Sequence, residues 1–104
     1  MDRKELLASI KELLQTAYGD RLKGVILYGS EARGDARVDS DFDLFVLLEG
    51  PVDFGKDLRF IIETLYHLQL EVIRPIHAMP VSALDFDSDK YRVYREAKTE
   101  GIWA

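Results

Sequence analysis

Apolar residues recur along this chain with two different periods, and the change between them separates the expected helices from the expected strands. Steps of three and four residues near the N-terminus predict an amphipathic helix over residues 2–17, which Asp2 can begin and Gly19 can end. The same spacing predicts a longer helix over residues 53–69. A last helix with mixed charges is expected over residues 90–100.

Short apolar runs between these helices predict three strands. The first covers residues 24–28, where β-branched and apolar side chains stop at a Gly-Ser turn, and the second covers residues 42–48. A third strand is expected over residues 71–76, with Pro75 placing its far end at a sheet edge or exit.

This order of elements indicates one α/β domain, or α+β by stricter usage, that spans residues 1–104. A chain of 104 residues has room for a single hydrophobic core. Pro80 and residues 85–89 are expected in a polar loop, and Ile102 and Trp103 in an apolar tail that docks on the core. We therefore expect a mixed sheet of three to four strands, with helices packed mainly on one face and a site on the open face.

Charge and composition narrow the classes of partner. The 14 Lys and Arg against 19 Asp and Glu give a net charge of −5, which disfavours generic binding to nucleic acid. Because the chain has no cysteine, it fits the reducing cytoplasm, where we expect it. The apolar runs are far shorter than the ~18 residues of a membrane span, so no membrane contact is expected. Charges within the first helical pattern differ from a signal peptide, so we expect the chain to start at Met1.

Two aspartates stand at the start of the second predicted strand. Asp41 and Asp43 are two residues apart, so an extended backbone would direct both carboxylates to one face, about 6–7 Å apart. Hard oxygen ligands at that separation suit a pair of Mg²⁺ ions bridged by a nucleoside triphosphate. Both faces of the strand are apolar beyond these two carboxylates. A bound metal would explain why charged side chains begin such a strand. A lone Asp-x-Asp pair, however, is most often a solvated strand entrance.

The Gly-Ser turn after the first strand is a candidate phosphate site. Gly29 and Ser30 stand where a strand gives way to a helical turn, so exposed backbone N–H groups there can hold a polyphosphate. An ordinary turn is the alternative. Arg33 could contact a phosphate, or it could lock the loop by pairing with Asp35 or Asp39.

Taken together, these residues resemble a known signature. From Gly29 to Leu44 the chain matches the pattern G-S-x-A-R-G-(x)5-S-D-x-D-L in full. The chain therefore resembles the polymerase-beta-like nucleotidyltransferase superfamily, and its small size is similar to that of the minimal nucleotidyltransferase (MNT) branch. The resemblance is strongest over residues 24–48.

The resemblance implies roles for the candidate site residues. The Gly-Ser pair would hold the nucleotide phosphates, with Arg33 as a further candidate, and Asp41 and Asp43 would bind two Mg²⁺ ions. This family usually has a third acidic residue on a neighbouring strand, which binds one metal and can act as a general base. Glu71, at the start of the third predicted strand, is the candidate, and a solvated strand start is its alternative. If Glu71 is not the third carboxylate, the site is expected to bind nucleotide and turn over poorly.

The remaining polar candidates are expected to be structural. His67 and His77 have no second histidine or cysteine at ligand spacing, so both are expected to be structural or surface residues. Arg74 could touch a nucleotide or an acceptor, but a salt bridge is the favoured interpretation in this acidic chain.

The resemblance also implies a reaction and a partner. An acceptor hydroxyl would attack the α-phosphate of a nucleoside triphosphate, with ATP as the expected substrate, and pyrophosphate would leave. Small members of this branch resemble antitoxins paired with a HEPN-domain ribonuclease toxin, so AMP transfer to such a toxin is the leading expectation, in a homo- or hetero-oligomer. The alternatives are transfer to a small molecule or RNA, and a catalytically weak antitoxin that acts by binding alone.

Overall fold

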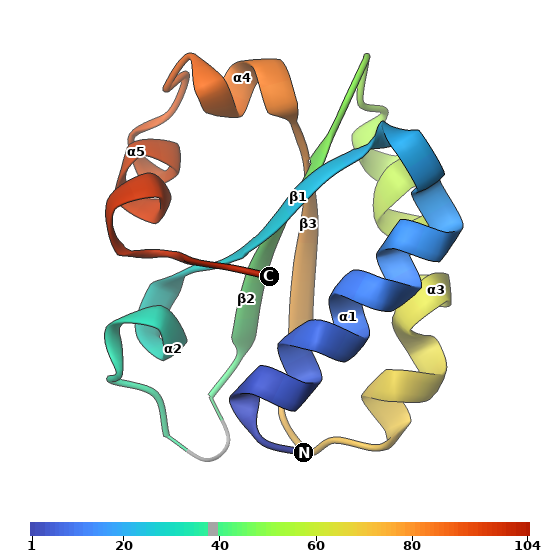
Figure 1. Ribbon diagram of the computed structural model, residues 1–104, viewed down its shortest axis with the longest axis vertical. Coiled ribbons are helices and arrows are strands. Elements are labelled where there is room, and N and C mark those ends of the chain that lie inside the picture. The colour runs from blue at the N-terminus through green and yellow to red at the C-terminus, as the bar shows by residue number, and fades with distance from the viewer. Residues whose placement is uncertain (38–39) are drawn as a thin grey trace.

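The strands join in one mixed sheet with the order β3-β2-β1-β4 in the computed structural model, which describes residues 1–37 and 40–104 (Figure 1). Strands β1 and β2 are antiparallel, β3 runs parallel to β2, and the short β4 runs antiparallel to β1. A parallel neighbour needs a crossover connection, and a helix supplies it between β2 and β3. The four strands are β1 (Leu22–Leu27), β2 (Phe42–Leu48), β3 (Ile76–Ser82) and β4 (Ile102–Trp103).

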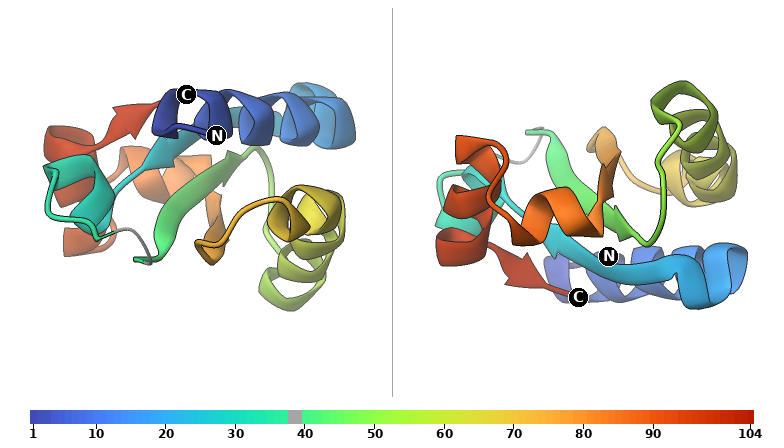
Figure 2. Two further views of the ribbon diagram at one scale, coloured as in Figure 1. Left: turned by 90° about the horizontal axis from the view of Figure 1, so that it is seen from below. Right: turned by 90° about the horizontal axis from the view of Figure 1, so that it is seen from above.

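Helices cover both faces of this sheet (Figure 2). The two long helices, α1 and α3, pack on one face, and the short α4 and α5 pack on the other. The described helices are α1 (Arg3–Tyr18), α2 (Gly29–Arg33), α3 (Phe54–Leu70), α4 (Ala83–Asp87), α5 (Arg92–Glu100) and the 3₁₀ turn η1 (Gly19–Arg21). None of these helices is long and apolar enough to cross a membrane, within the described part of the chain.

The first predicted helix is confirmed, including the residues expected to begin and end it. The Asp2 carboxylate accepts a hydrogen bond from the Glu5 N–H, and the Glu5 carboxylate accepts one from the Asp2 N–H, a reciprocal pair that satisfies two otherwise free donors. The helix ends at Gly19, as predicted. Its apolar stripe, which includes Ile10 and Leu14, is buried against α3 and the sheet.

Strand β2 is buried on both faces, as its sequence predicts. Its even-numbered apolar side chains belong to the core under α1 and α3, whereas Phe45 and Leu47 belong to the smaller core under α4 and α5. The second face is therefore not open along its length, because α4 buries Phe86 and α5 buries Ala97 against it. Asp43 lies on this second face, at the end of the strand that α4 and α5 leave accessible.

The third strand departs from the sequence prediction. The predicted bounds of this strand, residues 71–76, are wrong, because Glu71 ends α3 and the strand begins only at Ile76. The Gln69 side chain fixes the turn between them: its amide donates to the Arg74 carbonyl and its oxygen accepts from the Ile76 N–H. Pro80 lies within β3 because β3 is an edge strand, where a missing N–H is tolerated.

The C-terminal segment contains more regular structure than its sequence suggests. The polar loop expected around residues 85–89 is largely the short helix α4, which the Ser82 hydroxyl caps by accepting from the Asp85 N–H. The apolar tail does dock on the core, but as strand β4 paired with β1, which gives the sheet its fourth strand. The sheet is thus mixed and four-stranded, at the upper end of the expected range.

Candidate active site

Two carboxylates and an imidazole come together at the start of β2. Asp43 lies opposite His77 in the parallel pairing of β2 with β3, and Asp41 stands just before β2. The Nδ1 atom of His77 lies 3.3 Å from a carboxylate oxygen of Asp41 and 3.6 Å from one of Asp43. One ligand atom from each of the three side chains lies within 4.8 Å of the other two.

The environment of this group raises the pKa of Asp43. Burial is the largest cause, and the nearby Asp41 carboxylate adds to it, whereas His77 and Arg74 act in the opposite direction. Burial and then the Asp43 charge also raise the pKa of Tyr28 to about 12. Two like charges held this close disfavour each other's ionised forms, so a cation would stabilise the pair.

The Gly-Ser turn lies against Asp43. Gly29 opens α2 with a φ of +75°, a conformation that L side chains rarely adopt. A Cβ atom on Gly29 would lie 3.1 Å from the Asp43 carboxylate oxygen Oδ2. The backbone N–H of Tyr28 donates to the Asp43 carbonyl at 3.0 Å, which holds the turn beside the strand. Both the backbone conformation and the limited space therefore favour glycine at this position.

Arg33, at the end of α2, makes an exposed ion pair. Its Nε lies 3.3 Å from a carboxylate oxygen of Asp35, and both side chains are largely exposed. The pairing with Asp39 that the sequence also allowed lies outside the described residues. An exposed pair of this kind contributes only about 0–1 kcal/mol, so Arg33 can exchange Asp35 for another anion. Arg33 also lines a cavity of about 200 Å³ between α2 and α5, together with Gly29.

Arg74 forms a salt bridge, as favoured from the sequence, and it organises the entrance to β2. Its guanidinium pairs with Glu31 of α2, and its Nε donates to the Ser40 carbonyl at 2.8 Å. The same group lies over the ring of Phe42 and within 3.4 Å of the Asp41 carbonyl oxygen. Arg74 therefore connects α2 to the segment that carries Asp41. This role could not be predicted from the sequence, because the contacts join residues far apart in the chain.

Glu71 is not part of the acidic group. It caps the C-terminal end of α3 and lines a cavity with Met1 and Arg3, near the start of α1. Within residues 1–37 and 40–104, no third carboxylate joins Asp41 and Asp43. His77 occupies the place on the neighbouring strand where the sequence analysis expected an acidic residue. It was missed because the predicted strand ended before it, and the cross-strand register that pairs it with Asp43 is not visible in the sequence.

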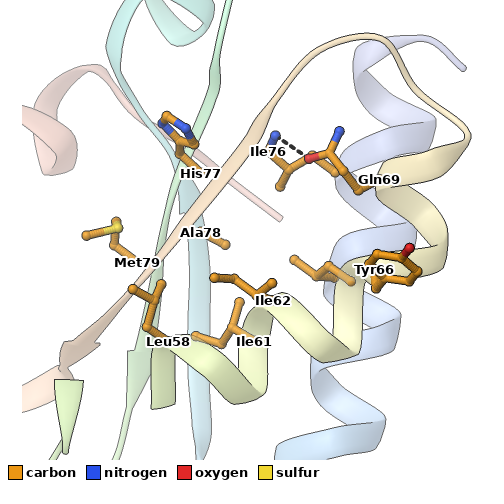
Figure 3. Close-up of a pocket in the computed structure, with 10 residues that line it drawn as sticks. Leu58, Ile61, Ile62, Tyr66, Gln69, Ile76, His77, Ala78 and Met79 are labelled. Atoms are coloured by element: carbon orange, nitrogen blue, oxygen red, sulfur yellow. Dashed lines mark hydrogen bonds between the residues drawn. The ribbon is translucent and has the colours of Figure 1, made fainter. Parts of the chain in front are cut away.

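An apolar cavity of about 310 Å³ lies between α3 and β3, and His77 is part of its wall (Figure 3). Most of its walls are aliphatic, and the exposed side chains of Ile62 and Tyr66 border it. The cavity is lined by Leu58, Ile61, Ile62, Leu65, Tyr66, Gln69, Ile76, His77, Ala78 and Met79. The His77 ring points to the other side of β3 from α3 (Figure 3), so His77 borders the cavity at the sheet edge while its imidazole lies with the two aspartates.

The chemistry of the donor group fits a divalent cation. Two carboxylate oxygens and one imidazole nitrogen are ordinary ligands for such an ion, and their separations allow all three to reach it. The fit differs from the expected one, in which three carboxylates would hold two Mg²⁺ ions.

Comparisons with known proteins agree with the signature. The family described as "Nucleotidyltransferase domain" matches residues 4–102. Two proteins of Methanocaldococcus jannaschii are similar, and both carry the name "Putative protein adenylyltransferase". MJ0604 is 39% identical over 54 residues, which are 52% of this chain and 52% of that protein. MJ0141 is 34% identical over 74 residues, which are 70% of this chain and 75% of that protein. The match thus spans about half the length of the first relative and three quarters of the second.

Proposed function

Because the chain belongs to the nucleotidyltransferase domain family of the polymerase-beta-like superfamily, we propose that it transfers AMP from ATP to a hydroxyl of a partner protein. Nucleotidyltransferase domains use nucleoside triphosphates and metal ions. The observation that carries the proposal is the convergence of Asp41, Asp43 and His77 beside the Gly29 turn. The names of the two relatives support a protein acceptor and an adenylyl group.

The proposed transfer forms one bond and breaks one bond. The acceptor's hydroxyl oxygen attacks the α-phosphorus of ATP, the bond to the β-phosphate breaks, and pyrophosphate leaves with that electron pair. The hydroxyl proton passes to a nearby base or to water. A divalent cation held by Asp41 and Asp43 would activate the hydroxyl and neutralise the charge that develops on the transferred phosphate.

On the nucleotide side, the proposal assigns Gly29, Ser30 and Arg33 to the phosphates of ATP. The close approach of Gly29 to Asp43 supports this, because phosphates on the turn would then reach a cation on the aspartates. The exposed pair of Arg33 with Asp35 supports it too, since an exposed ion pair is easily exchanged. Glu71 has no role in this proposal, and His77 takes the place on the neighbouring strand.

On the acceptor side, we assign the apolar cavity between α3 and β3 to the acceptor. The cavity reaches the exposed edge of β3 at His77, so an acceptor segment held there would extend around this edge to bring its hydroxyl to the aspartates. The resemblance to the MNT branch implies a HEPN-domain toxin as this partner, which makes the chain an antitoxin of the cytoplasm acting in a hetero-oligomer. The net charge of −5 argues against RNA as the acceptor.

A second candidate function is neutralisation of a toxin by binding alone. The imidazole of His77 in place of a third carboxylate favours it, because fewer acidic groups would be available for the transfer step. Both candidate functions use the same fold. AMP transfer requires Asp41 and Asp43, whereas neutralisation by binding alone does not.

One experiment separates the two candidates. The full chain is incubated with α-labelled ATP, a divalent metal salt and the protein encoded by the neighbouring gene, and then the Asp41→Asn and Asp43→Asn variants are tested. Label should appear on the partner and fall to background in both variants. Asp20→Asn is the matched control, since this exposed carboxylate lies in η1, at the opposite end of β1 from the site. Unchanged labelling with both site variants would refute the catalytic proposal, and full neutralisation of a toxin by them would support binding alone.

A further inference from the structure

The donor group of this site differs from an all-carboxylate site in one ligand. Asp41 and Asp43 supply oxygen atoms, and the third side chain in reach is the imidazole of His77. This third position is fixed by the sheet, because His77 and Asp43 are direct partners in the pairing of β3 with β2. Side chains of such partners lie on the same face, one strand spacing apart. The nitrogen donor is therefore built into the fold.

The separations of the donor atoms suit one ion. With metal–ligand distances of about 2.1 Å, adjacent donors on an octahedral ion are about 3.0 Å apart and opposite donors about 4.2 Å apart. The His77 nitrogen lies 3.3 Å and 3.6 Å from the two carboxylates, between these limits. A second ion would need further oxygen donors, and in the described residues no third carboxylate joins the group. The protein without nucleotide can thus hold one ion with small adjustments.

The three side chains are also open to solvent, and among the described residues no Lys or Arg forms an ion pair with either aspartate. The exposed fractions of the side chains are 47% for Asp41, 28% for Asp43 and 55% for His77. Arg74, the nearest guanidinium, is held by Glu31 and by the Ser40 carbonyl and not by these carboxylates. An ion can therefore enter from solvent without displacing a salt bridge of Arg74.

The identity of the donors decides which ion binds. Mg²⁺ is a hard cation that takes oxygen ligands and gives up its water reluctantly, whereas imidazole suits the first-row transition ions. We propose that Asp41, Asp43 and His77 form a one-ion carboxylate–imidazole site that prefers a first-row transition ion to Mg²⁺. This inference rests on the proposed function for the use of the ion, but its test measures binding alone. Affinity should rise from Mg²⁺ to Mn²⁺ and again to Co²⁺.

Calorimetric titration of the full chain with MgCl₂ and CoCl₂, without nucleotide, tests the preference. The wild type should bind one Co²⁺ at least about tenfold more tightly than Mg²⁺. The variant His77→Asp, which supplies a third carboxylate, should lower the ratio of the two affinities by at least about tenfold. His67→Gln is the matched control, because this histidine lies on α3 outside the group and should leave the ratio unchanged. An equal ratio in the wild type and His77→Asp would overturn the proposal.

The deciding result of a second measurement comes from the wild-type chain. Mn²⁺ bound to the wild-type chain should show the ¹⁴N modulation of a ligating imidazole in electron spin echo spectra, and the signal should be lost in His77→Gln. Bound Mn²⁺ without ¹⁴N modulation would refute the nitrogen ligand. In that case the labelled-ATP experiment still decides the proposed function, since transfer can proceed with carboxylate ligands alone. If the wild-type chain shows ¹⁴N modulation but transfers no label, the proposed function is refuted and the metal site still stands.

Discussion

The Gly29 turn offers a sharp test of the site, because the same substitution can be made at a matched position. Gly29→Ala should cost about 1–2 kcal/mol of stability, since its φ of +75° is unfavourable for a residue with a Cβ atom. Gly34, at the other end of α2, has a φ of +80° and should lose a similar amount. The two alanine variants therefore share the backbone strain.

The two positions differ in what the new methyl group meets. At Gly29 it would lie 3.1 Å from the Asp43 carboxylate, whereas at Gly34 nothing lies within 4 Å. The first variant must therefore move Asp43 or the turn by a few tenths of an ångström, and the second need not. Because misplacement of reacting groups by about 1 Å costs on the order of 100-fold in rate, a shift of this size should cost about tenfold.

The assay pairs urea unfolding with initial rates of labelled AMP transfer at saturating partner. Both alanine variants should lose similar stability, and only Gly29→Ala should lose rate. If Gly34→Ala slows transfer as much as Gly29→Ala, or if neither does, the close approach of the turn to Asp43 has no part in the reaction.

Three further predictions concern other parts of the chain. Asp57→Asn should lower the free energy of unfolding in urea by about 2 kcal/mol, because the buried carboxylate accepts hydrogen bonds from Arg21 at 3.0 and 3.3 Å. Burial alone would raise the pKa of Asp57, but its hydrogen bonds lower it below the usual value. The stabilisation should therefore be full above about pH 4 and be lost on further acidification. This pH dependence should be seen when the wild type is unfolded and be absent from Asp57→Asn. Ile62→Asp, in the apolar cavity, should weaken partner labelling and leave Co²⁺ affinity unchanged. The control Leu84→Asp, at an exposed position on α4, should alter neither. Glu71→Gln should transfer AMP at the wild-type rate, and a large loss would return Glu71 to the site.

The sequence predicts best what depends on neighbouring residues. The strand over residues 42–48 has the predicted bounds, because the alternation of buried side chains is a local pattern that both cores satisfy. The signature around Asp41 and Asp43 likewise holds in one short segment. The start of β3 could not be predicted in this way, since the Gln69 side chain and the pairing with β2 set it. Pro80 also argued against a strand there, and only the edge position of β3 makes it acceptable.

The charge of the site follows from these long-range contacts and links the metal to the nucleotide. The guanidinium of Arg74 is paired with Glu31 and makes no ion pair with Asp41 or Asp43, so its charge offsets theirs only in part. Burial and the neighbouring charge already disfavour ionisation of Asp43, and the phosphates of ATP on the Gly29 turn would add further negative charge beside it. A cation on the aspartates removes this repulsion and gives the phosphates a ligand at the same time. Metal and nucleotide should therefore bind cooperatively. His77, as the nitrogen donor of the group, would then determine which metal strengthens nucleotide binding.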